Sequence, residues 1–159
     1  DASIVDWKNC IQDLCGEYFI RHPAVIGGVS QVVEIDESAW TKHKYNRGRA
    51  VATQWVFGGI GRDTRECFAI PVDRRDVSTL LPLIYQFILP GTTIYSDQWG
   101  VYNSIINVNN GPSRYTHATV NHSLNFVDPT TLVHTQSVEN MWMLSLCGVV
   151  NLKIALLKT

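Results

Sequence analysis

Three apolar, β-branched runs follow one another in the first half of the chain, with no helical pattern between them. They cover residues 30–38, 51–60 and 66–72. The last two are joined by Gly61-Arg62-Asp63, a short turn that predicts a hairpin. Because strands connected in this way pair antiparallel, the sequence predicts a sheet that begins with three consecutive antiparallel strands.

Helices and strands alternate in the rest of the chain. Apolar side chains at helical spacing over residues 4–19 predict an amphipathic helix leading into the core. Asp76 is the expected N-cap of the first helix after the three strands. The later elements are a helix at 77–88, a strand at 92–97, a helix at 98–107, a strand at 115–121 and a final helix from Ser137 onward.

Size and charge fit one globular domain. The chain has 159 residues, and 13 Lys and Arg residues nearly balance 14 acids. The basic residues gather locally, which leaves room for a basic surface despite the neutral total. Four cysteines without a CxxC pair indicate reduced, structural thiols. The N-terminus shows no signal peptide, and its lack of an initiator Met is typical of a processed product or a fragment of a longer chain.

Three acids stand where a sheet and a helix could bring them together. Alternation along a strand places Glu34 and Asp36 on one face of the sheet and Glu37 on the other. Asp97 closes the strand at 92–97, and Glu139 lies on the first turn of the final helix. Carboxylates are the ligands that Mg²⁺ prefers, and bound cations would compensate their charge. We therefore expect Asp36, Asp97 and Glu139 to support metal-dependent phosphoryl transfer.

Five motifs in combination resemble those of a known family of DNA-processing enzymes. They are VVEIDESAW (32–40), KHKYNRGR (42–49), TTIYSDQWGVY (92–102), TVNHSLNFVDP (119–129) and HTQSVENMW (134–142). Over residues 24–142 the chain resembles the Merlin-type DDE transposases and the related bacterial, ISXO2-like insertion-sequence family. The resemblance implies an RNase H-like α/β fold, a mixed five-stranded sheet with its first three strands antiparallel, flanked by helices. Residues 1–23 would form a linker helix, and residues 24–159 the catalytic domain with an atypical apolar C-terminal tail.

The resemblance also implies a reaction. The protein would bind transposon ends, cleave DNA with metal-activated water and join the freed 3′ hydroxyl to target DNA. Asp36 would bridge two Mg²⁺ or Mn²⁺ ions, while Asp97 and Glu139 would each hold one. Assembly on two DNA ends would favour a homo-oligomer, in the nucleus of a eukaryote or the cytoplasm of a bacterium, and no membrane is implied.

Several other residues have two interpretations. A basic loop would grip DNA phosphates or be merely solvated, and two histidines would contact a scissile phosphate or only bond within loops. Glu34 and Glu37 would assist the metal site or lie at a solvated or ion-paired surface, while Trp99 and Trp142 would anchor the core beside the acids. The candidate DNA-binding residues are Lys42, Lys44, Arg47, Arg49, His122 and His134.

The C-terminal residues leave alternatives open. Where the family continues with polar and basic residues, this chain reads MLSLCGVVNLKIALLKT, which fits a decayed or out-of-frame tail or a genuine buried helix. A membrane span would need about 20 apolar residues, more than this run offers. The alternative function is thus a catalytically inactive, domesticated or truncated DNA-binding protein of the same fold. A third possibility, a hydrolase with a carboxylate pair, would work without metal.

Overall fold

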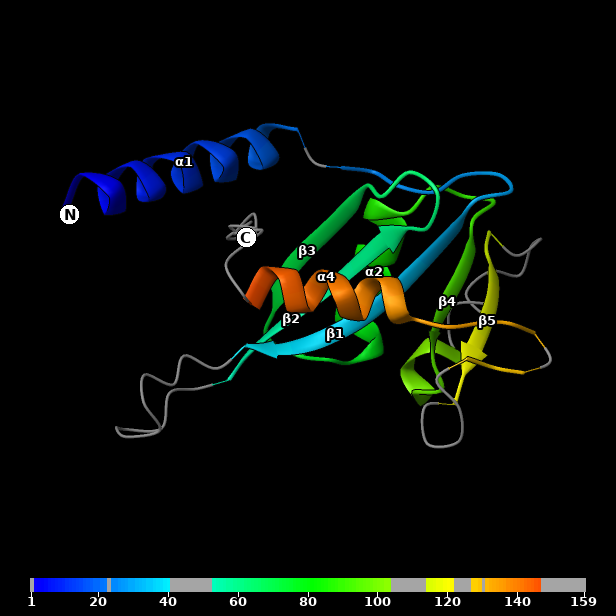
Figure 1. Cartoon of the computed structure of the whole chain (residues 1–159). Helices are drawn as coiled ribbons and strands as arrows, with labels where there is room; N and C mark the ends of the chain where they lie inside the picture. The colour runs from blue at the N-terminus through cyan, green and yellow to red at the C-terminus, as the bar shows by residue number, and fades with distance from the viewer. Residues whose placement is uncertain are drawn as a thin grey trace.

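The computed structural model describes residues 2–22, 24–40, 53–103, 114–121, 127–129 and 131–146. At its centre is a five-stranded sheet in the order β3-β2-β1-β4-β5 (Figure 1). Strands β1, β2 and β3 pair antiparallel, whereas β1 pairs with β4, and β4 with β5, in parallel. The bounds are β1 (Val32–Trp40), β2 (Gln54–Gly61), β3 (Cys67–Val72), β4 (Thr93–Asp97) and β5 (Thr116–Val120).

Two helices pack on opposite faces of this sheet. Helix α4 (Gln136–Leu146) crosses one face over β1 and β2, and α2 (Val77–Phe87) lies on the other (Figure 1). The expected N-cap is confirmed, because Asp76 Oδ1 accepts a hydrogen bond of 2.9 Å from the backbone N–H of Thr79. A mixed sheet of this topology between helices is the RNase H-like fold expected from the sequence.

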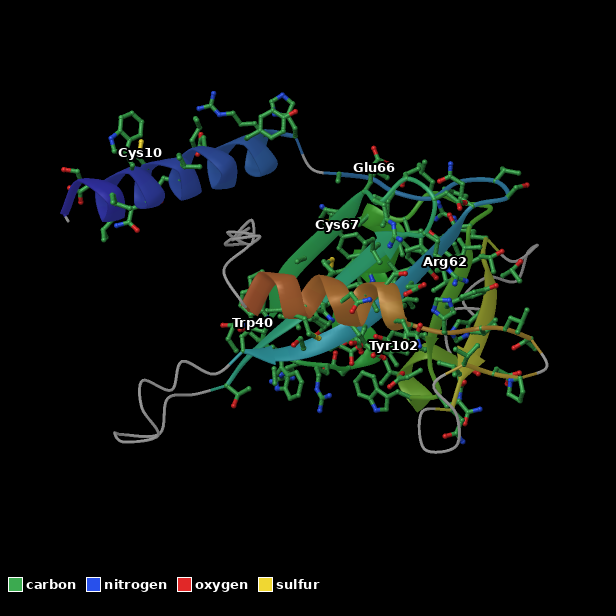
Figure 2. The ribbon with its side chains drawn as sticks, viewed as in Figure 1. Cys10, Trp40, Arg62, Glu66, Cys67 and Tyr102 are labelled. Carbon is green, nitrogen blue, oxygen red and sulfur yellow. The ribbon has the colours of Figure 1, made fainter. Side chains whose placement is uncertain are left out.

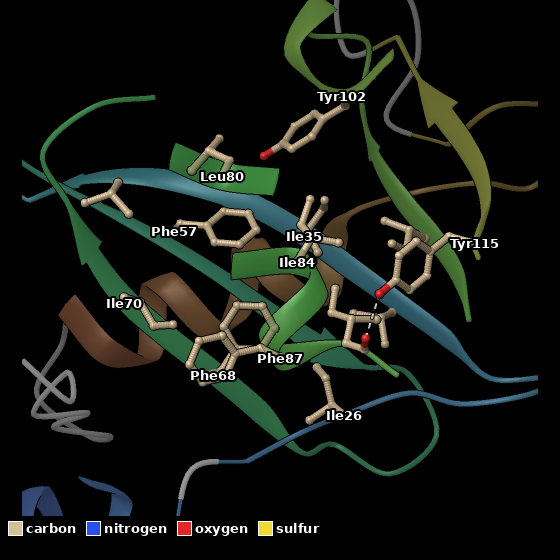
Figure 3. Close-up of a cluster of buried hydrophobic side chains, with 14 residues drawn as sticks. Ile26, Ile35, Phe57, Phe68, Ile70, Leu80, Ile84, Phe87, Tyr102 and Tyr115 are labelled. Carbon is tan, nitrogen blue, oxygen red and sulfur yellow. Dashed lines mark hydrogen bonds between the residues drawn. The ribbon is translucent and has the colours of Figure 1, made fainter. Parts of the chain in front are cut away.

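Strand alternation divides the apolar core between the two faces. Side chains at odd positions of β1, such as Val33 and Ile35, pack against α2 with the aromatic rings of β2 and β3 (Figure 3). The face under α4 is smaller and contains Val56, Ile60, Ala69, Val138, Met141 and Trp142. Glu34 and Asp36 therefore point toward α4 and not toward the larger core.

Helix α1 (Ala2–Arg21) forms as the helical spacing of its apolar residues predicted. The large apolar side chains of α1 whose burial the structure describes are 54–70% exposed, and Figure 1 shows α1 extending away from the sheet. The chain first joins the sheet at Ile26, which bridges to Ile88, and no other described element covers the apolar stripe. The exposed residues are Ile4, Val5, Trp7, Ile11, Leu14 and Tyr18.

Two other expected elements are only partly seen. Of the helix expected at 98–107, the described residues contain a single 3-10 turn, η1 (Gly100–Asn103). The basic loop with Lys42, Lys44, Arg47 and Arg49, the histidine His122, and residues 147–159 all lie outside the described residues. Within the described part of the chain, none of the helices is both long and apolar enough to cross a membrane.

Candidate active site

Asp36 and Asp97 occupy corresponding positions on two adjacent parallel strands. The register of β1 and β4 pairs Val33 with Ile94 and Glu34 with Tyr95. The pairing ends there, and the same register continued by two residues would bring Asp36 level with Asp97. Asp97 is the last residue of β4, whereas Asp36 lies in the middle of β1, which continues beyond its pairing with β4 to Trp40.

Helix α4 holds the carboxylate of Asp36 in place. The indole Nε1 of Trp142 donates a hydrogen bond of 3.1 Å to Asp36 Oδ2. Gly58 of β2 pairs with Asp36 of β1, and a Cβ atom added at Gly58 would lie 2.5 Å from the Trp142 ring. The glycine therefore makes room for the indole. Trp142 is 5% exposed, which confirms the expected core anchor beside an acid.

The other two acids each accept a local hydrogen bond. Thr135, a buried residue just before α4, donates its hydroxyl hydrogen to Glu139 Oε1 over 3.2 Å. The backbone N–H of Trp99 donates to Asp97 Oδ1 over 3.1 Å. The orientation of all three carboxylates is thus restrained by groups of the fold.

The pKa of Asp36 responds to burial and to the charges of both other acids. Burial raises the pKa of Asp36 from 3.8 to about 7. Hydrogen bonds from the backbone of Glu37 and from Trp142 oppose this shift, and the negative charges of Asp97 and Glu139 add to it. Near neutral pH the Asp36 carboxyl is therefore divided between its protonated and ionised forms.

Glu37 is a fourth acid at the same edge of the sheet. Its pKa is raised from 4.5 to about 8, mainly by burial and also by the charges of Asp36 and Asp97, against the lowering effect of the Arg75 charge. Among the described residues its buried Oε1 has no hydrogen-bond partner. Arg75 stacks on Trp55, with its guanidinium carbon 3.6 Å from the ring centroid. Glu37 is half-buried, so the interpretation as a solvated surface residue is wrong.

Glu34 is fully buried, so its interpretation as a surface residue is also wrong. Its Oε2 accepts hydrogen bonds from the backbone N–H groups of Ser137 and Val138, at 2.7 and 3.2 Å. Its Oε1 lies 3.1 Å from Arg62 Nε and 3.6 Å from His134 Nδ1. Figure 2 shows Arg62 beside the N-terminal end of α4.

His134 belongs to the same cluster. Its Nε2 accepts a hydrogen bond from the guanidinium of Arg62, and its side chain is 20% exposed. Of the six candidate DNA-binding residues, His134 is the one whose surroundings the structure describes. Sequence reasoning missed Arg62, which follows β2 in a turn and carries no local signal of a buried partner.

The three acids fit a divalent metal in their chemistry. Their carboxylate oxygens are the hard donors that Mg²⁺ and Mn²⁺ prefer, and a cation would offset the charge that raises the pKa of Asp36. Among the described residues, however, no group of three His, Cys, Asp or Glu side chains is arranged to hold one ion. Asp36, Asp97 and Glu139 would have to close on a shared ion.

Comparison with known proteins identifies one matching family. The family model for the ISXO2-like transposase domain matches residues 28–145 of this chain. No curated protein sequence matches it.

Two solved viral structures are similar at low identity. The first is the simian T-cell lymphotropic virus intasome in complex with PP2A regulatory subunit B56 gamma, with 14% identity and a TM-score of 0.46 over 77% of this chain and 41% of that one. The second is the HTLV-2 integrase catalytic core domain in complex with magnesium, with 11% identity and a TM-score of 0.39 over 59% of this chain and 63% of that one. The chain thus spans less than two thirds of either matched chain.

Proposed function

Because the chain belongs to the ISXO2-like transposase domain family, we propose that it catalyses metal-dependent cleavage and strand transfer of DNA. One observation carries the catalytic part of this proposal. The half-buried Asp36 carboxyl interacts with the charges of both Asp97 and Glu139 and has its pKa raised to about 7. Carboxylates with perturbed pKa values gather at functional sites, and Asp36 is such a carboxylate under the influence of two other acids.

Asp36, Asp97 and Glu139 would hold the metal, either Mg²⁺ or Mn²⁺, and we propose two ions. When bound, such ions activate a water or hydroxyl nucleophile and stabilise the leaving oxygen of an in-line displacement at phosphorus. The protein's own contribution is orientation. Asp36, which interacts with both other acids, is restrained through Trp142, and Glu139 is restrained through Thr135.

The substrates in this proposal are transposon ends and target DNA, on which the chain would assemble as a homo-oligomer. The basic loop of residues 41–50, with Lys42, Lys44, Arg47 and Arg49, would contact phosphates next to the end of β1. His122 and His134 would lie closer to the scissile phosphate. Because such contacts neutralise phosphates, the affinity for DNA should fall steeply as the salt concentration rises.

Nicking of a supercoiled plasmid tests the proposal without knowledge of the recognised DNA end. The wild-type chain should convert supercoiled to open-circular DNA in Mn²⁺ and not in EDTA. Asp36→Asn, Asp97→Asn and Glu139→Gln should each abolish nicking, whereas Glu66→Gln, an exposed carboxylate in the turn before β3, should leave it intact. DNA binding without nicking by the wild type would support the inactive, DNA-binding alternative. Nicking that persists in EDTA would contradict metal dependence.

A further inference from the structure

The buried carboxylate of Glu34 ties together parts of the fold that are far apart in sequence. From β1 it accepts hydrogen bonds from Ser137 and Val138, in the first turn of α4. Its other oxygen pairs with Arg62, in the turn after β2. Arg62 in turn packs its guanidinium carbon 5.4 Å from the ring centroid of Tyr95, the residue paired with Glu34 on β4.

These contacts compensate a charge that would otherwise be costly to bury. Glu34 has 0% exposure, and an isolated carboxylate in such a place would destabilise the fold. The Arg62 guanidinium offsets its charge, and the free N–H groups and positive dipole end of α4 add charge-assisted hydrogen bonds. Because breaking a buried pair leaves one charge uncompensated, the arrangement resists small displacements.

The position of this cluster relates it to the catalytic acids. Glu34 precedes Asp36 by two residues on the same face of β1, and Val138 directly precedes Glu139 on α4. We propose that Glu34 and Arg62 are positioning residues, which fix the first turn of α4 against β1 and so set where the Glu139 carboxylate lies relative to Asp36. Neither residue touches the metal or DNA in this proposal, and its catalytic consequence rests on the proposed function.

A double-mutant cycle on Mn²⁺ binding tests whether Glu34 acts through Glu139. Glu34→Gln keeps the shape of the side chain and removes its charge, and it should weaken Mn²⁺ binding by about 10- to 100-fold. If Glu34 acts by placing Glu139, the double variant with Glu139→Gln should bind no more weakly than Glu139→Gln alone. Effects that multiply in the double variant would overturn the proposal, since they would show that Glu34 acts independently of Glu139.

Arg62 provides a second variant in case Glu34→Gln does not fold. Arg62→Met should weaken Mn²⁺ binding in the same way, and Arg62→Lys should recover part of it because the ammonium can still pair with Glu34. Arg65→Met is the matched control, since it removes the same charge from an exposed position three residues away. Equal binding by Arg62→Met and Arg65→Met would contradict the proposal.

Amide hydrogen exchange without metal separates this proposal from the proposed function. In Arg62→Met and Glu34→Gln, the amides of Ser137 and Val138 should exchange about tenfold faster or more, while that of Ala69 in β3 stays unchanged. A wild type that binds no Mn²⁺ would defeat the proposed function, and the exchange rates alone would then decide whether the cluster positions α4. Unchanged exchange at Ser137 and Val138 would overturn the positioning role.

Discussion

The indole of Trp142 donates a hydrogen bond of 3.1 Å to the carboxylate of Asp36, and it reaches that carboxylate across a glycine of the neighbouring strand. The same contact packs α4 on the sheet and orients an acid of the candidate site. Changes in this contact should therefore affect both the stability of the fold and the chemistry of the site.

Gly58→Ala should destabilise the protein through overpacking. The new Cβ would lie 2.5 Å from the Trp142 ring and 2.8 Å from the backbone oxygen of Phe68. We expect a loss of about 1–3 kcal/mol in the free energy of unfolding, measured in urea. Gly100→Ala is the control, because nothing lies within 4 Å of its Cβ. Equal stability of the two variants would show that the indole does not depend on the glycine.

Trp142→Phe should change the pH dependence of metal binding. The Trp142 hydrogen bond lowers the pKa of Asp36, so its loss should raise that pKa above about 7. Protons would then compete more strongly with Mn²⁺ near neutral pH. The affinity for Mn²⁺, measured by calorimetry, should therefore begin to rise at a higher pH than in the wild type. Trp7→Phe, in the exposed α1, should keep the wild-type profile. A Trp142→Phe profile that overlays the wild type would argue against the contact's role.

Asp36→Asn should stabilise the metal-free protein, and more so at higher pH. The folded-state pKa of about 7 lies above the ordinary value of 3.8, so the folded protein binds this proton more tightly than the unfolded chain. The stabilisation that this protonated carboxyl adds to the fold is fully present below about pH 4. It is lost as pH rises through 7, which lowers the free energy of unfolding by up to about 4 kcal/mol. Urea unfolding in EDTA at pH 5 and pH 8 measures the difference between variant and wild type. A difference independent of pH would mean that Asp36 is not protonated in this range.

Truncating two leucines should distinguish the core from the exposed stripe of α1. Leu80→Ala, at 1% exposure beneath the sheet, should cost about 2–5 kcal/mol of unfolding free energy. Leu14→Ala, at 70% exposure, should change it by less than about 0.5 kcal/mol. Both are measured by urea unfolding. A large cost at Leu14 would show that α1 packs against another surface in solution.

The sequence predicted the strands, and which of them carry the candidate aspartates, because both depend on local patterns. Alternating apolar residues located β1, and Asp97 ends β4 as expected, whereas Asp36 lies in the middle of β1 and not near its end. The N-cap Asp76 was equally local. These features need only the strand period and the chemistry of a cap, so a single sequence suffices to find them.

Contacts between distant segments could not be predicted in the same way. Alternation put Glu34 on the face of Asp36, but it did not show that α4 would cover that face and bury the carboxylate. Arg62 looked like an ordinary turn residue, because its partner is 28 positions away in the chain. The amphipathic spacing of α1 predicted the helix, but it did not show that the apolar side chains named above, from Ile4 to Tyr18, would be exposed. One available signal was Gly58 within a strand, which often marks a close approach.

The metal site proposed at Asp36 can be tested by calorimetric titration of Mn²⁺ at pH 7.5 into the wild type and Asp36→Asn, because Asp36 interacts with both other acids. We expect saturable binding by the wild type and none detectable by Asp36→Asn, with Glu66→Gln as an unchanged control. Equal binding by the wild type and Asp36→Asn would contradict this expectation, since the metal would then lie away from the three acids.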